Sequence, residues 1–140
     1  MNSKMETTEL LIKLIDLGSN INRQLAGPLS MHGIGLTEYL VLRHLQQSEE
    51  QRMRRVDLAA RVGLTPSGIT RLLNPMEKMG LVQKQANPRD ARVSLVELTS
   101  AGEQIFQDAS QGFNQSAEQL LKRFNFEDQQ ELTRLLGLIL

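Results

Sequence analysis

The stretch VDLAARVGLTPSGITRLLNPMEKMGLV, from Val56 to Val82, has the pattern of two short helices joined by a tight turn. The first helix should end at Gly63, because glycine readily adopts the left-handed conformation of a helix C-terminus. The second should begin with Thr65 as N-cap and Pro66 at the first helical position. Its apolar residues follow the spacing i, i+3, i+4, i+7 of one helix face, and they are Ile69, Leu72, Leu73 and Met76.

A charged hairpin is expected directly after these helices. LVQKQA (81–86) and RVSLVEL (92–98) are predicted strands, and the polar, proline-containing turn NPRD (87–90) separates them. Gly80 should end the preceding helix, and Pro75 should bend its last turns because proline removes one backbone hydrogen bond. Two helices joined by a tight turn and followed by a hairpin form a winged helix-turn-helix.

Helices are also expected on the amino-terminal side. Leucine and isoleucine at spacings of three and four predict a helix from about Glu6 to Leu25. The segment AGPLSMHGIGLT (26–37), with one proline and three glycines, should interrupt it. Thr37 is the expected N-cap of a second helix, and QQSEEQR (46–52) is expected to be a polar connection.

The carboxyl-terminal side predicts two more helices. Thr99 or Ser100 should cap a long helix that runs to Phe124, and Glu103 should complete a capping box with Ser100. A last helix should start near Glu127 and bury an apolar stripe. The expected fold is mainly α with a small β-hairpin (α+β) and forms a single domain, 1–140. Residues 36–98 are the winged-helix lobe, and 1–30 and 100–140 are flanking helices.

The charge of the chain is unevenly distributed, although its 16 basic and 16 acidic residues make it formally neutral. Between Arg52 and Arg92 there are nine basic and three acidic residues, a net charge of +6, which leaves −6 for the remainder. Such a basic middle attracts polyanions locally, while the acidic ends limit indiscriminate association.

The composition also argues against several classes of protein. The chain has no cysteine and only two histidines, which excludes disulfides, thiolate sites and a cysteine nucleophile and disfavours a metal centre. No glycine-rich phosphate loop or metal-ligand spacing supports an enzyme, and no cofactor is expected. No run of 18 apolar residues could span a membrane, and the N-terminus lacks the apolar core of a signal peptide. These features predict a cytoplasmic protein.

Double-stranded DNA is the expected partner of the basic middle. On the outer face of the second helix, hydroxyl, amide and guanidinium groups can bond phosphates or base edges, and Arg71 suits guanine. Gly68 would allow close backbone approach, and Thr65 with the helix N-terminus could hold a phosphate. The plain alternative is a solvated face of an ordinary core helix. The expected contacts of this unit are Arg54, Arg55, Thr65, Ser67, Gly68, Thr70, Arg71 and Asn74.

Residues 56–82 followed by NPRDARVSLVELTSAGE (87–103) resemble the MarR family of transcriptional regulators, and the resemblance covers essentially the whole chain. The most specific part is the hairpin, with Asp90, Arg92, Leu98 and Thr99 at the family's spacing. One departure is Asn87, where many relatives place an acid before the proline.

The resemblance implies roles for the charged residues of the hairpin. Arg92 would enter the minor groove, whose negative potential favours arginine, and Asp90 would orient it. A carboxylate that aims the arginine in advance reduces the entropy lost on insertion. Arg89 is expected to contact phosphate. The alternative is a charged turn with a surface ion pair of under ~1 kcal/mol.

The resemblance further implies a homodimer built from the terminal helices, acting as a repressor on a pseudo-palindromic operator. An intrachain helix bundle is the alternative to the dimer. A small aromatic or phenolic effector would release the DNA, and Met31, His32, Tyr39 and Arg43 would line its pocket by approximate position. Ordinary loop and helix packing also explains these four residues. A winged-helix protein–protein module is the rival function, and it predicts an acidic or apolar outer face on the second helix.

Overall fold

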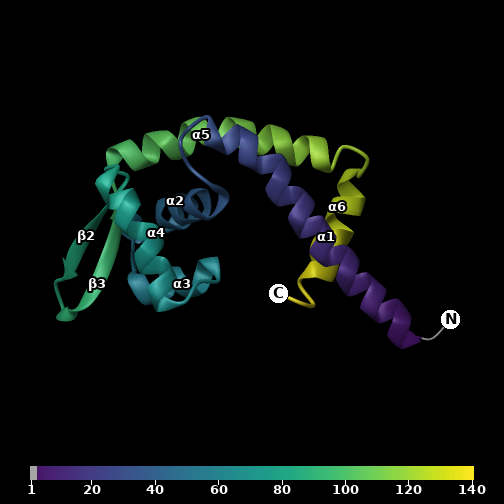
Figure 1. The fold of residues 1–140 in the computed structure, drawn as a ribbon, viewed down its shortest axis with the longest axis horizontal. Helices are drawn as coiled ribbons and strands as arrows, with labels where there is room; N and C mark the ends of the chain where they lie inside the picture. Colours follow the sequence, from purple (N-terminus) through teal and green to yellow (C-terminus); the bar gives the residue numbers. More distant parts are fainter. Residues whose placement is uncertain (1–2) are drawn as a thin grey trace.

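The computed structural model describes residues 3–140, in which six α-helices, one short 3-10 helix and a three-stranded antiparallel sheet are found. Helix α5 runs along one edge of the molecule, with the winged-helix lobe beneath one end and α1 and α6 at the other (Figure 1). In chain order the elements are α1 (Ser3–Ser30), α2 (Leu36–Gln47), η1 (Glu49–Gln51), β1 (Arg52–Arg54), α3 (Arg55–Val62), α4 (Pro66–Lys78), β2 (Val82–Asn87), β3 (Asp90–Leu98), α5 (Ser100–Leu120) and α6 (Phe126–Leu136).

The hydrophobic core lies in the winged-helix lobe, where α2, α3 and α4 pack against the sheet. Leu42, Leu58 and Leu73 are fully buried there, one from each helix, and Val96 is the fully buried contribution of β3. Burying one such side chain contributes about 1.5–3 kcal/mol. The carboxyl-terminal end of α1 and the middle of α5 join this core, so the lobe is attached firmly to the outer helices.

The turn between α3 and α4 forms as the sequence predicts. Gly63 caps α3 in the left-handed conformation, with φ 71° and ψ 32°. Thr65 is the N-cap of α4, because its Oγ1 accepts a hydrogen bond of 3.0 Å from the Gly68 N–H, and Pro66 is the first helical residue. Helix α4 continues through Pro75 to Lys78. Three residues of the predicted apolar stripe are buried, and Leu72 is partly buried.

Helix α1 is longer than expected. It begins at Ser3 and continues through Gly27 and Pro28 to Ser30, so the predicted end near Leu25 is wrong. Leu25 and Leu29 are both buried in the core of the lobe. The burial of Leu29 accounts for the extension, because tertiary packing routinely outweighs the local helix-breaking tendency of glycine and proline.

The start of α2 differs by two residues from the prediction. Gly35 is the N-cap, not Thr37, and the Gly35 N–H donates to Glu38 Oε1 at 3.0 Å. Glycine is tolerated at an N-cap, and the Glu38 side chain supplies the acceptor that the glycine N–H needs. Thr37 therefore lies inside the first turn of α2.

The sheet contains a third strand that the sequence does not predict. The second half of the expected polar connection forms η1 and β1, and β1 pairs with β3 so that the strand order is β1-β3-β2. The pairs are Arg52 with Glu97, Met53 with Val96 and Arg54 with Leu95. A strand of three residues has too little alternation to be recognised in a sequence.

The hairpin is longer than the two predicted strands. Pairing of β2 with β3 extends from Val82 and Leu98 to Asn87 and Asp90, with a register shift between Ala86 and Asn87. Asp90 therefore belongs to β3 rather than to the turn. Asn87 Oδ1 accepts a hydrogen bond of 2.9 Å from the Arg89 N–H, which closes the tip.

The cap of α5 is Thr99, one of the two residues expected there, and the cap of α6 was not predicted. Thr99 caps α5 by accepting from the Gly102 N–H at 3.0 Å, so the predicted box of Ser100 with Glu103 is wrong. Helix α5 ends at Leu120, before Phe124. Asn125 caps α6 through a reciprocal pair of hydrogen bonds with Asp128. The spacing of these two residues is visible in the sequence, but no cap was predicted there.

Large apolar side chains of the amino-terminal and carboxyl-terminal helices are exposed to solvent. On α1, Leu10 is 59% exposed and Ile15 is 56% exposed, and Phe126 is 72% exposed at the start of α6. None of the residues of α6 is buried. Within residues 3–140, no helix is both long and apolar enough to cross a membrane.

Candidate nucleic-acid interface

Helix α4 presents one apolar and one polar face. Ile69, Leu73 and Met76 are fully buried against the lobe. On the opposite side Ser67, Arg71 and Asn74 are exposed, which is where the sequence places them. An exposed serine, arginine and asparagine on one short helix can bond phosphate oxygens or base edges.

The first turn of α4 is held by its own side chains. Thr65 Oγ1 accepts from the Gly68 N–H and lies 3.3 Å from Ser67 Oγ. A Cβ at Gly68 would lie 3.1 Å from Thr65 Oγ1, which is tighter than ordinary contact. Gly68 therefore keeps the cap intact, a role that does not require a ligand.

The wing, defined here as β2, β3 and the turn between them, carries an exposed arginine held by a carboxylate. Asp90 Oδ1 accepts from the Arg92 backbone N–H at 3.0 Å and from Arg92 Nε at 3.2 Å. The Arg92 side chain is nevertheless 91% exposed. Arg89 is also exposed, at the tip of the wing. The pair fixes the stem of Arg92 and leaves the end of its guanidinium free.

The charge on Asp90 is stabilised by its neighbours. The hydrogen bond from the Arg92 N–H lowers the pKa of Asp90 most, and the bonded Arg92 side chain and the nearby charge of Arg54 lower it further. A lowered pKa means that the carboxylate is ionised at every pH above its ordinary value. Asp90 can thus hold Arg92 throughout the neutral range.

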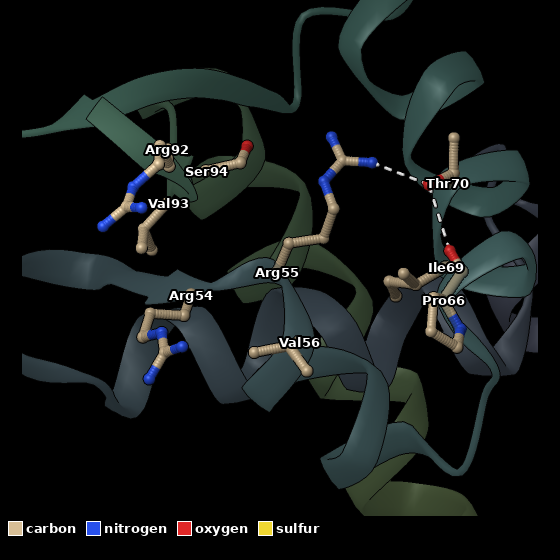
Figure 2. A pocket seen from close by; sticks show the side chains of 9 residues that line it. All are labelled: Arg54, Arg55, Val56, Pro66, Ile69, Thr70, Arg92, Val93 and Ser94. Carbon is tan, nitrogen blue, oxygen red and sulfur yellow. Dashed lines mark hydrogen bonds between the residues drawn. The ribbon is translucent and has the colours of Figure 1, made fainter. Parts of the chain in front are cut away.

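A cleft of about 290 Å³, called here the wing cleft, separates β3 from the starts of α3 and α4 (Figure 2). Arg92, Val93 and Ser94 line it from the wing, and Arg54 and Arg55 line it from the opposite side. Ser94 is exposed. It was not predicted as a site residue, because a single serine in a strand does not indicate a DNA-binding surface. The wing and the beginning of α4 therefore line the same cleft.

Adjacent arginines at the wing cleft have different surroundings. Arg54 is exposed. The Arg55 side chain is only 18% exposed, and its Nη1 donates to Thr70 Oγ1 at 3.0 Å, as Figure 2 shows. Of the eleven residues expected to contact DNA, Arg55 and Thr70 are therefore bonded to each other rather than presented outward.

The four residues expected around an effector are not brought together. Met31 and His32 lie on an open groove of about 950 Å³ between the end of α1 and α5. Tyr39 is buried in the core, where its hydroxyl lies 2.8 Å from Ser110 Oγ and its ring stacks on two phenylalanines. Arg43 is exposed on α2. The groove is instead rich in amide side chains, contributed by Gln24, Gln111, Gln115 and Gln119.

The helices, the wing and the polar face of α4 define a winged helix-turn-helix protein. Residues 34–94 match the model of the MarR family. The chain is 22% identical over 129 residues to the transcriptional repressor YetL of Bacillus subtilis. The aligned residues cover 92% of this chain and 77% of YetL. A MarR-family domain thus occupies residues 34–94, and the relatives that match most of this chain are transcriptional regulators.

Solved structures share the whole fold. The MarR-family regulator Sco3205 from Streptomyces coelicolor, in complex with DNA, has a TM-score of 0.88 and 23% identity, covering 96% of this chain and 86% of that one. A mutant of MarR from E. coli, in complex with operator DNA, has a TM-score of 0.87 and 24% identity, covering 100% of this chain and 99% of that one. These likenesses extend beyond the lobe to the terminal helices.

Proposed function

We propose that this regulator binds double-stranded operator DNA, with α4 in the major groove and the wing in the minor groove. The observation that carries the proposal is the wing cleft, which the exposed Arg92, held by Asp90, lines together with the beginning of α4. Arginine aimed in advance at a narrow minor groove gains from its negative potential. An exposed Arg71 on α4 can read a base edge in the adjacent major groove.

Two further observations support DNA as the partner. Sco3205 and MarR, which have the same fold over nearly all of this chain, were each solved with DNA. The outer face of α4 is polar and cationic, whereas a protein–protein module would present an acidic or apolar face there. With DNA as the partner, we propose the cytoplasm as the site of action.

The proposed functional form is a homodimer. Apolar side chains of α1 and of the chain end, among them Leu10, Ile15 and Leu138, are exposed in the single chain. Exposed apolar side chains in this number mark an interface, and a second copy would bury them. An intrachain bundle does not cover these residues. We assign 1–30 and 100–140 to dimerisation and 36–98 to DNA binding, and twofold symmetry then requires a pseudo-palindromic operator.

Repression and release by an effector complete the proposal. YetL is named a repressor, and this supports repression of transcription by the present protein. A small aromatic or phenolic effector would bind in the amide-rich groove between the end of α1 and α5, which Met31 and His32 line. Because the chain has no cysteine, reversible control by thiol oxidation is unavailable to it.

Selection of bound fragments from the source genome, followed by footprinting, tests the proposal. The expected result is one class of pseudo-palindromic sites, with half-sites about 10 base pairs apart or a multiple of that spacing. Protection should cover the major groove at each half-site and the minor groove beside it. Recovery of fragments without a shared sequence would contradict operator binding.

A further inference from the structure

We infer that Arg55 is a positioning residue that holds α4 in place for DNA binding and does not itself contact DNA. The inference rests on the proposed function, since it concerns how the reading helix is held. Arg55 is the first residue of α3, and its side chain reaches across to α4. One guanidinium thereby connects the two helices of the motif.

The Arg55 guanidinium contacts two successive levels of α4. Its Nη1 donates to Thr70 Oγ1 at 3.0 Å, and its Nη2 lies 3.7 Å from Glu77 Oε1. Residues seven apart occupy the same face of a helix two turns away from each other. A rigid, planar group that binds at both levels opposes rotation and tilt of α4 relative to α3.

Glu77 makes this arrangement sensitive to the loss of Arg55. Glu77 Oε1 is buried and has no hydrogen-bond partner among the described residues, so the charge of Arg55 is its compensation. A buried carboxylate oxygen left without its cation is strongly unfavourable. Without Arg55, this oxygen would have to turn toward water, to which the Glu77 side chain is already 24% exposed, and α4 would lose its link to α3.

Thr70 belongs to the same network. Its hydroxyl donates to the Pro66 carbonyl oxygen at 3.0 Å while it accepts from Arg55. A hydroxyl has one hydrogen, so Thr70 cannot donate to DNA while these two bonds stand. Thr70 therefore helps to position α4, and base reading is left to the exposed side chains of that helix.

Arg54 provides a matched control. It is the preceding residue, it lines the same wing cleft, and its side chain is exposed. Arg54→Met and Arg55→Met remove one charge each and keep a long apolar stem. Each phosphate contact that is lost reduces the slope of log affinity against log salt by about 0.9.

Fluorescence-anisotropy titrations of operator DNA over a series of salt concentrations separate the two roles. Arg55→Met should lower affinity about tenfold at every salt concentration and leave the slope unchanged. Arg54→Met should reduce the slope. A reduced slope for Arg55→Met, or wild-type affinity, would overturn the inference. Loss of salt dependence and operator preference in the wild-type protein would instead contradict the proposed function.

A double-mutant cycle with Glu77→Gln gives an independent readout. In the Arg55→Met background, Glu77→Gln removes the unpaired charge and should restore part of the lost affinity, whereas alone it should weaken binding slightly. If Arg55 contacted DNA, the two effects would simply add, and that result would refute the positioning role. Should Arg55→Met fail to fold, the double variant, which lacks the unpaired carboxylate, carries the salt series.

Discussion

Asp90 places a negative charge on a surface that we propose approaches DNA. Coulomb repulsion alone predicts that its removal tightens binding. Because Asp90 Oδ1 fixes both the backbone and Nε of Arg92, we expect Asp90→Ala to weaken operator binding by about threefold to tenfold, through the ordering cost of a free arginine. Asp90→Asn keeps an oxygen acceptor and should lose less. Tighter binding by Asp90→Ala in anisotropy titrations would show that the pair has no bracing role.

Gly102 joins α5 to the base of the wing by close packing. A Cβ there would lie 2.1 Å from the Leu81 carbonyl oxygen and 2.8 Å from Leu98 Cδ1. We expect Gly102→Ala to lower the free energy of unfolding by about 3 kcal/mol in urea denaturation, since backbone must move. Gly18→Ala is the control, because its Cβ meets nothing within 4 Å, and it should be neutral or stabilising. Equal stability of the two variants would contradict this packing.

Helix caps separate what the sequence predicts from what the fold imposes. Thr65 caps α4, whereas Thr37 lies inside α2 behind the true N-cap, Gly35. Thr65→Ala should therefore cost about 1 kcal/mol of unfolding free energy, and Thr37→Ala should cost under about 0.5 kcal/mol. Thermal or urea denaturation of both variants measures the difference. A larger loss for Thr37→Ala would invalidate the assignment of the caps.

The helix-turn-helix could be predicted because its signals are local. Gly63, Thr65 and Pro66 each act within one turn of the chain, and the apolar spacing of α4 is regular. The continuation of α1 through Pro28 could not be predicted, because it depends on the burial of Leu29 by distant residues. Strand β1 was missed for a similar reason, since its partner β3 lies more than 40 residues further along the chain.

The sequence predicted which residues form the candidate site, but it did not predict for each of them whether the side chain points outward or inward. The exposed Ser67, Arg71 and Asn74 follow from helical periodicity, and the pairing of Asp90 with Arg92 follows from the family resemblance. Arg54 and Arg55 look equivalent in the sequence. Which of two adjacent arginines points inward depends on Thr70 and Glu77 across the motif, and only the folded structure shows this.

At the scale of the whole molecule, the uncovered apolar side chains predict dimerisation through the terminal helices. Ile15→Glu places a charge on that surface and should shift the protein from dimer to monomer, with weaker operator binding. Val56→Glu is the control, because Val56 is 55% exposed but lies on the lobe, and it should remain dimeric. Sedimentation measures the oligomeric state of both variants. A stable wild-type monomer at micromolar concentration would contradict the proposed assembly.

The central claim is that α4 reads operator bases while the basic surface binds phosphates. Fluorescence-anisotropy titration of wild type and Arg71→Ala against the operator and its single base-pair variants tests it most directly. With ~6–10 phosphate contacts per dimer, the slope of log affinity against log salt should lie near −5 to −9. Arg71→Ala should lose about 1–3 kcal/mol and its preference at one base position in each half-site. Equal binding of operator and shuffled duplex, or every base preference retained by Arg71→Ala, would contradict the account.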